Sequence, residues 1–158
     1  MTAARADHET RGRADERPLR IRGIDHVVLR VVEVERMERF YCDVLGCAVE
    51  RRVAELGLVQ LRAGRSLIDL VTVEGKLGRV GGAAPGAEGR NLDHVCLRIE
   101  AFDLGALCDF LAAYGVAIGE SGTRYGAEGS GPSLYIQDPE GNVVELKGPP
   151  DESAVAGR

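Results

Sequence analysis

The 158-residue sequence has no tryptophan, only three histidines and no long hydrophobic run. No segment reaches ~18 consecutive apolar residues, so we expect no transmembrane helix. The polar N-terminal stretch MTAARADHETRGRADERP lacks the apolar segment of a secretory signal. A net charge of −5 argues against a nucleic-acid or anionic-membrane surface. We therefore expect a cytoplasmic protein that binds a small molecule, with no nucleic acid or membrane as its partner.

The four cysteines include no CxxC pair, and we expect no signal peptide that would direct them to an oxidising compartment. We interpret Cys42, Cys47, Cys96 and Cys108 as reduced thiols, most of them buried. The remaining composition, with 44% hydrophobic and 28% charged residues, is that of a globular protein. A chain of this length buries enough surface to fold without disulfide bonds.

One internal repeat organises the chain. The segment DHVVLRV at Asp25–Val31 recurs as DHVCLRI at Asp93–Ile99, 68 residues later. Each copy precedes a helical pattern that ends at a glycine, over Glu35–Gly46 and Asp103–Gly115. Together with the polar chain ends, the repeat predicts a disordered tail at 1–20, a first module at 21–74, a linker at 75–90, a second module at 91–148 and a disordered tail at 149–158.

After each helix the sequence continues with three strand-like runs. They cover Cys47–Ala54, Leu58–Arg62 and Leu67–Val73 in the first half, and Val116–Arg124, Ser133–Gln137 and Asn142–Lys147 in the second. The second half is eight residues longer, and we place the extra residues in a glycine-dense loop at Tyr125–Pro132. The predicted fold class is α+β, with two βαβββ modules whose mixed sheets form a cup around one metal site.

Side chains alternate between the two faces of a strand, so one face of each predicted sheet is aliphatic and packs on the helix. The other face carries His26 and Asp69 in the first module, and His94 and Glu145 in the second. Each carboxylate is flanked by aliphatic residues, where an unpaired charge is costly. Two imidazoles and two carboxylates suit one divalent metal ion, so we predict a shared site for Zn, Ni, Mn, Co or Fe.

The same alternation places further polar side chains around the predicted metal site. The candidates for substrate binding are Gln60, Arg62, Arg124, Ser133, Tyr135 and Gln137. Arginines at these positions suit a carboxylate or phosphate group on a substrate, and they equally suit a solvated sheet edge.

Four segments, IDHVVLRV, FYCDVLG, LDHVCLRI and SLYIQDPEGNVVELKG, resemble the vicinal oxygen chelate superfamily, which includes glyoxalase I, bleomycin-resistance proteins and extradiol dioxygenases. The resemblance covers residues 21–148 and implies a cup of two βαβββ modules around one divalent metal ion. In glyoxalase-like members the ligands come from the first and last strand of each module, which here correspond to His26, Asp69, His94 and Glu145. The resemblance also implies a homodimer.

The sequence departs from glyoxalase I at two places. Asp69 stands where glyoxalase I carries a glutamate, so its carboxylate reaches one methylene less far. Without it, His26, His94 and Glu145 form the two-histidine, one-carboxylate set typical of iron oxygenases. Arg30 matches the arginine with which glyoxalase I holds glutathione, but the Asn-Trp-Gly motif of that enzyme is replaced at 72–75.

Three functions are the main candidates for these residues, and a fourth, a metal-assisted thiol transferase acting on an antibiotic, fits three ligands but lacks a cation-loop signature in this sequence. The first is a metal-dependent, glyoxalase-like lyase or isomerase, in which a small substrate chelates the metal through two neighbouring oxygens and Glu145 or Asp69 moves a proton. The second is an Fe(II)-dependent ring-cleavage dioxygenase, and the third is a non-catalytic protein that sequesters a ligand, as bleomycin-resistance proteins do. The sequence leaves open whether the site forms within one chain or between two.

Overall fold

The structure is a computed structural model that describes residues 19–151. The parts of the two predicted tails at 1–18 and 152–158 lie outside these residues. The first module contains β1 (His26–Val31), α2 (Val34–Arg39), a π-helical turn (Phe40–Val44), β2 (Ala48–Val53), a short 3₁₀ turn (Ala54–Leu56), β3 (Leu58–Ala63) and β4 (Ser66–Thr72). Its strands are ordered β1-β4-β3-β2, with β1 parallel to β4 and the other pairs antiparallel.

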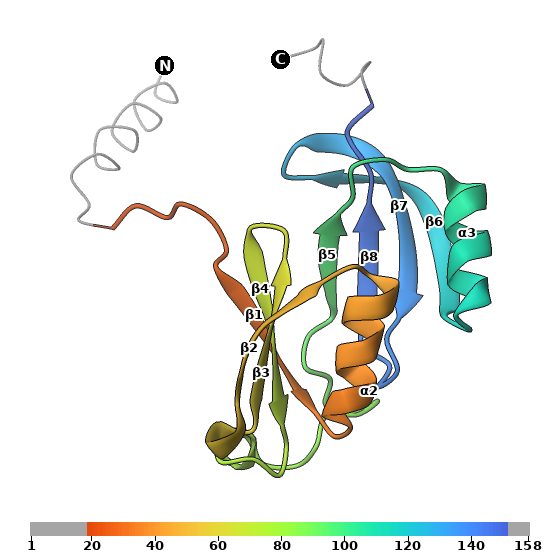
Figure 1. Ribbon diagram of the computed structural model, residues 1–158. Helices are drawn as coiled ribbons and strands as arrows, with labels where there is room; N and C mark the ends of the chain where they lie inside the picture. Colours follow the sequence, from red (N-terminus) through yellow and green to blue (C-terminus); the bar gives the residue numbers. More distant parts are fainter. Residues whose placement is uncertain (1–18, 152–158) are drawn as a thin grey trace, which may run out of the picture.

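The second module repeats this arrangement (Figure 1). It contains β5 (His94–Arg98), α3 (Leu104–Ala113), β6 (Ala117–Gly126), β7 (Gly129–Gln137) and β8 (Val143–Lys147), and it follows a linker with a 3₁₀ turn at Gly78–Gly81. Its strand order is β5-β8-β7-β6, again with one parallel pair. The predicted α+β class with two βαβββ modules is therefore confirmed. No helix among residues 19–151 has the length and apolar character needed to cross a bilayer.

The first helix differs from its predicted form. Instead of one α-helix over Glu35–Gly46, the chain changes at Phe40 to a π-helical turn, in which the Leu45 amide donates to the Phe40 carbonyl. The helical phase then ends at Gly46, whose φ of 74° is left-handed and favours glycine. A periodic apolar pattern does not predict such a turn, because π turns are rare and occur mostly as single turns within α-helices.

The predicted glycine-dense loop at 125–132 is wrong. Most of it is strand: β6 and β7 pair as far as Gly126 and Gly129, which leaves only two residues for the turn. The glycines permit close approach instead of mobility, since a Cβ on Gly131 would lie 2.5 Å from the Pro149 carbonyl oxygen. The Asp151 amide then donates to the Ser130 carbonyl, so residues 149–151, which we expected in the tail, run beside β7.

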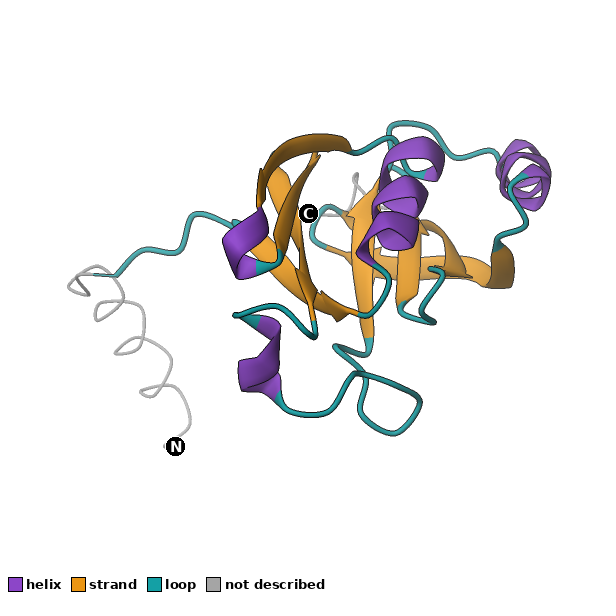
Figure 2. Ribbon diagram, turned by 60° about the horizontal axis from the view of Figure 1, so that its bottom comes forward, coloured by secondary structure: helices purple, strands orange, loops and turns teal. Residues whose placement is uncertain are grey.

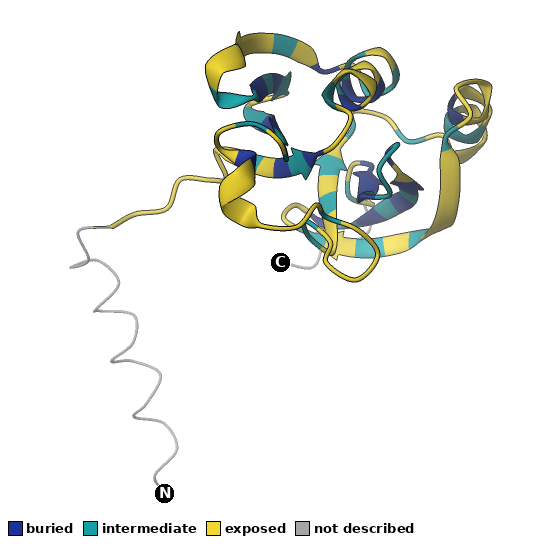
Figure 3. Ribbon diagram, turned by 90° about the horizontal axis from the view of Figure 1, so that it is seen from below, coloured by how far each residue is buried: buried dark blue, intermediate teal, exposed yellow. Residues whose placement is uncertain are grey.

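Both sheets pack against one apolar core. The strand residues that face it are Leu29, Val31, Leu61, Ile68, Leu70, Leu134, Ile136, Val144 and Leu146. Met37, Phe40 and Tyr41 fill the space between the sheets, and Figures 1 and 2 show α2 lying there. The buried segments gather around this contact, while the outer side of α3 and the linker are exposed (Figure 3). The sheet faces that carry the histidines therefore lie opposite the shared core, and we call them the open faces.

Only Cys47 is buried among the four cysteines, so the expectation that most of them are buried is wrong. Cys42 and Cys108 are half-buried on the helices, and Cys96 is exposed on the open face of the second sheet. All four are free thiols.

The DPEGN turn between β7 and β8 joins the two modules. The buried Asp138 carboxylate accepts the Tyr41 hydroxyl at 3.0 Å and the side-chain amide of Asn142 at 2.8 Å. The Glu140 carboxylate accepts the backbone amides of Val32 and Glu33, just before α2. One turn of the second module thus positions the first helix of the first module.

We expect Tyr41→Phe to lower the free energy of unfolding by about 1–2 kcal/mol, because a buried carboxylate loses one hydrogen-bond donor while the ring stays in place. Urea denaturation measures this change. Tyr114→Phe is the matched control, since Tyr114 is 53% exposed. Equal changes in the two variants would contradict the role assigned to the Tyr41 hydroxyl.

Candidate functional site

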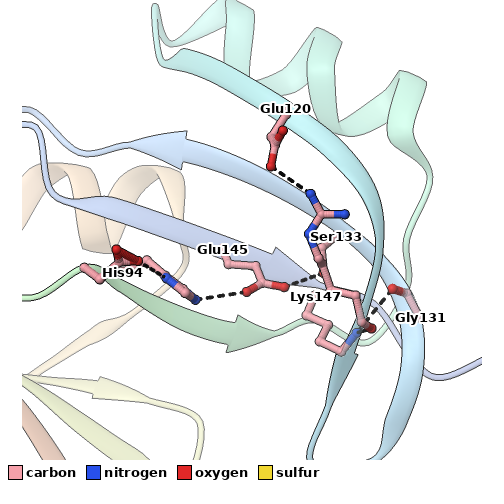
Figure 4. A network of polar contacts seen from close by, with 8 residues as sticks. His94, Glu120, Gly131, Ser133, Glu145 and Lys147 are labelled. Atoms are coloured by element: carbon pink, nitrogen blue, oxygen red, sulfur yellow. Dashed lines mark hydrogen bonds and ion pairs between the residues drawn. The ribbon is translucent and has the colours of Figure 1, made fainter.

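The second sheet brings His94 and Glu145 together on its open face. They come from the adjacent parallel strands β5 and β8, and the His94 Nε2 lies 3.3 Å from the Glu145 Oε2 (Figure 4). Glu145 is only 5% exposed, whereas the His94 side chain is 37% exposed. The pair therefore combines a half-buried imidazole with a nearly buried carboxylate.

Glu145 is the centre of a polar cluster. The buried Ser133 hydroxyl donates to its Oε1 at 2.5 Å, and the Tyr135 hydroxyl and the Cys96 thiol also bond to the carboxylate. Burial acts to raise the pKa of Glu145, but these hydrogen bonds and the nearby His94 outweigh it and hold the pKa below its ordinary value. The carboxylate is thus kept ionised, which suits a ligand for a cation.

The first sheet carries the equivalent pair, His26 and Asp69. The Gln60 side-chain amide donates to Asp69 Oδ2 at 2.8 Å, while Asp69 Oδ1 is buried with no hydrogen-bond partner. Nearly all buried polar atoms in proteins are paired, so an unpaired carboxylate oxygen calls for a partner that the single chain does not provide. A metal ion, a metal-bound water or a proton on a substrate satisfies such an atom.

An aspartate precedes each histidine and orients its ring. Asp25 Oδ1 lies 2.8 Å from His26 Nδ1, and Asp93 Oδ1 lies 2.7 Å from His94 Nδ1. The hydrogen bond that Asp25 accepts from the His26 ring raises the pKa of His26 and outweighs the opposite effect of burial, and the charge of Asp69 raises this pKa further. Carboxylates bound to one ring nitrogen leave the other nitrogen as the metal ligand in many metal sites. Both histidines therefore present Nε2 to the open face.

The four predicted ligands form two pairs that the single chain does not unite. Across residues 19–151 no group of three or more histidine, cysteine, aspartate or glutamate side chains lies close enough to hold a metal ion. The reason is the shared core, which sits between the helix sides of the two sheets and turns their open faces away from it. Nitrogen and carboxylate donors on each face nevertheless fit one half of a site for Zn, Ni, Mn, Co or Fe.

Three of the predicted substrate-binding residues contact the site carboxylates: Gln60, Ser133 and Tyr135. The Tyr135 ring also meets the His94 ring edge-on, with 5.7 Å between centroids. Arg124 lies farther out, with its guanidinium 5.6 Å from the centre of the Tyr135 ring and paired with Glu120. Arg62 pairs with Glu50 at 3.2 Å on the first sheet.

The side chain of Arg30 is hydrogen-bonded to the linker between the two modules. Its guanidinium donates to the carbonyl oxygens of Gly78, Gly81, Gly82 and Ala83, at 2.7–3.1 Å. A Cβ on Gly81 would lie 2.5 Å from this guanidinium, so the linker closes tightly around it. Substrate binding by Arg30 stays a prediction, and the donors that it would need already hold the linker.

Two kinds of residue in this region were not predicted from the sequence. Asp25 and Asp93 belong to the first kind, although the Asp-His dipeptide in both repeats is a signal for them. Lys147 is 5% exposed, and its amine donates to the carbonyls of Arg124 and Gly131, which fastens the β6–β7 hairpin to β8 (Figure 4). A lysine at the end of an alternating strand carries no signal of such a role.

The family comparison agrees with this architecture. The model of the Glyoxalase/Bleomycin resistance protein/Dioxygenase superfamily matches residues 23–146. The chain therefore belongs to this superfamily, and the resemblance seen in the sequence is confirmed.

Solved structures with the same fold have diverse descriptions. An integron cassette protein from the mobile metagenome of V. cholerae is 28% identical with a TM-score of 0.62, over 82% of this chain and 97% of that one. A lactoylglutathione lyase from Agrobacterium tumefaciens is 20% identical with a TM-score of 0.56, over 84% and 96%. An antibiotic-binding protein from Streptomyces sp. CB03234 is 20% identical with a TM-score of 0.58, over 83% and 98%. The last two likenesses show the fold alone.

We expect Ser133→Ala to raise the pKa of Glu145, because the ionised carboxylate loses its shortest hydrogen bond. NMR titration of the glutamate side-chain carboxyl carbons measures the change. Ser121→Ala is the control, since Ser121 is an exposed residue of β6. An unchanged Glu145 pKa in Ser133→Ala would show that this hydroxyl does not stabilise the charge.

Proposed function

We propose that the protein is a metal-dependent lyase or isomerase of the glyoxalase type, acting on a small substrate that chelates a divalent metal ion through two neighbouring oxygens. The observation that carries the proposal is the repeated histidine–carboxylate pair on the two open sheet faces. The buried and unpartnered Asp69 Oδ1 supports it, because this atom needs a partner from outside the chain.

We propose that a second copy of the chain completes the site. Each open face holds half of a ligand set, and the two halves of one chain point away from their common core. In a symmetric dimer, the first module of one chain covers the second module of its partner, and the same contact is repeated once. Exposed apolar residues on both faces support the contact, since Val28 is 46% exposed on the first sheet and Ala117 is exposed on the second.

In this arrangement His26 from one chain and His94 and Glu145 from the other hold the metal ion. Both histidines offer Nε2, because their Nδ1 atoms are bound by aspartates. Asp69 is left out of the ligand set for two reasons: its side chain is one methylene shorter than glutamate, and Gln60 holds its Oδ2. The bound metal supplies Lewis-acid stabilisation of the negative charge that develops on the substrate oxygens.

Asp69 is then the general base. Its Oδ1 is a buried carboxylate oxygen with no hydrogen-bond partner in the chain, so it is available to accept a proton. It takes the proton from the hydroxyl-bearing carbon of the substrate and returns it to the neighbouring carbonyl carbon. The hydroxyl proton passes to the former carbonyl oxygen, so that hydroxyl and carbonyl exchange places without an external oxidant. Gln60 fixes the carboxylate during both transfers.

Mixing two inactive variants tests the shared site. We expect His26→Ala and His94→Ala each to lose tightly bound metal, because each removes a ligand from both sites of the dimer. After the two variants are refolded together, about a quarter of the wild-type metal content should return, since half of the dimers are mixed and each has one intact site. Elemental analysis after gel filtration measures it. A mixture that stays without metal would contradict a site built from two chains.

A second experiment distinguishes the proposed base, Asp69, from the proposed metal ligand Glu145. We expect Asp69→Asn to keep the wild-type metal content and Glu145→Gln to lower the metal affinity more than roughly a hundredfold, beyond the loss typical of residues that only orient a ligand. Competition with a coloured chelator measures both affinities. If Asp69→Asn loses metal as severely as Glu145→Gln, Asp69 is a ligand and the assignment of the base is wrong.

A further inference from the structure

A pocket of about 270 Å³ opens on the second sheet, and its lining includes Val143 and Tyr135, the register partners of His94 and Glu145. It is lined by Ala117, Ile118, Gly119, Tyr135, Ile136, Gln137 and Val143. None of these residues is charged, and Gln137 and the Tyr135 hydroxyl are the only polar side-chain groups among them. The pocket is therefore suited to an apolar group.

The strand register places this pocket next to the proposed metal ligands. His94, Val143, Gln137 and Ala117 occupy one row across the sheet, because each is the register partner of the next. The following row carries Glu145 and its register partner Tyr135. Since residues in register share a face, the pocket wall begins at the strand next to His94 and continues to the sheet edge. A substituent in the pocket would therefore be directly connected to the part of the substrate that is held at His94 and Glu145.

The first sheet carries different residues at the equivalent positions. Its corresponding row contains His26, Leu67, Arg62 and Ala48. There the position of Gln137 is taken by Arg62, which pairs with Glu50. The two halves of the site thus differ: one side of the ligand set is charged and the other is apolar.

We infer that the substrate carries a compact apolar substituent, aromatic or branched, which occupies this pocket while the neighbouring oxygens bind the metal ion. The inference rests on the proposed function and adds the substrate class to it. An apolar cavity of about 150 Å³ accepts benzene, so a pocket of this size accepts a phenyl group with one or two added carbons. A charged group on the substituent would find no partner on this uncharged wall.

Two hydroxamates serve as probes, because each chelates a divalent metal through two neighbouring oxygens and neither is a substrate for isomerisation. Benzohydroxamate carries a phenyl group and acetohydroxamate a methyl group. Calorimetry of the metal-loaded full chain gives both affinities, each normalised to the affinity of the same hydroxamate for the free metal ion. We expect benzohydroxamate to bind about tenfold or more tightly after normalisation, because the phenyl group is buried.

Filling the pocket should remove this preference. We expect Val143→Phe to bring the ratio of the two affinities close to one, whereas Leu67→Phe leaves it unchanged. Leu67 is the matched control, since it pairs with His26 as Val143 pairs with His94, and both are half-buried. Ala117→Phe and Ala48→Phe form a second pair at exposed strand positions, where a larger side chain is tolerated without unfolding.

The outcomes separate this inference from the function on which it rests. A preference that is lost in Val143→Phe and Ala117→Phe but kept in Leu67→Phe and Ala48→Phe supports the pocket. Equal normalised affinities in the wild type overturn the apolar substituent while leaving the chelating site intact. If neither hydroxamate binds to the metal-loaded chain, the proposed function fails and the inference falls with it.

Discussion

The packing of both sheets on one apolar core determines where this protein can form a site. Leu29, Leu70, Leu134 and Val144 all face that core, and Tyr41 lies between the sheets. Since strand side chains alternate, burial of these residues requires that His26, Asp69, His94 and Glu145 occupy the opposite faces. The requirement that stabilises the chain therefore also separates its two histidine–carboxylate pairs, and it favours a site completed by a second chain.

The family-typical DPEGN segment has a structural role in this chain. Asp138 is saturated with hydrogen bonds from Tyr41, Asn142 and Glu140, which leaves it no capacity to bind a ligand. Glu140 holds the start of α2, and Asn142 contacts Asn91, whose side chain pairs with the Arg30 backbone. The segment thus fixes the two modules relative to each other. It also places Glu145 on the strand that follows.

Much of this arrangement could be predicted from the sequence. The repeat around His26 and His94 and the alternation in the strands give the two modules, the buried faces and the acidic partners, since these depend on local periods of two and 3.6 residues. The π turn at Phe40 and the strand-forming glycines near Gly131 could not be predicted in this way. They depend on contacts between distant segments, such as the passage of Pro149 over β7.

The candidate site could likewise be predicted from the sequence only in part. Gln60, Ser133 and Tyr135 were placed on the open face by strand phase, and each contacts a site carboxylate. The resemblance to glyoxalase I predicts that Arg30 binds a substrate, but it cannot show that the linker carbonyls bind its guanidinium, because those residues are about 50 positions away in the sequence. The relative orientation of the two open faces depends on the shared core and is equally invisible to local patterns.

The metal content of the full-length protein, purified without chelator or histidine tag, tests the central claim most directly. We predict about one equivalent of a divalent metal per chain, carried by a dimer, because each dimer has two equivalent sites. Zinc, nickel, manganese or cobalt would support the lyase or isomerase, whereas iron would favour ring-cleavage oxygenation. No bound metal after loading with each of these ions would contradict the account and leave a protein that only binds its ligand.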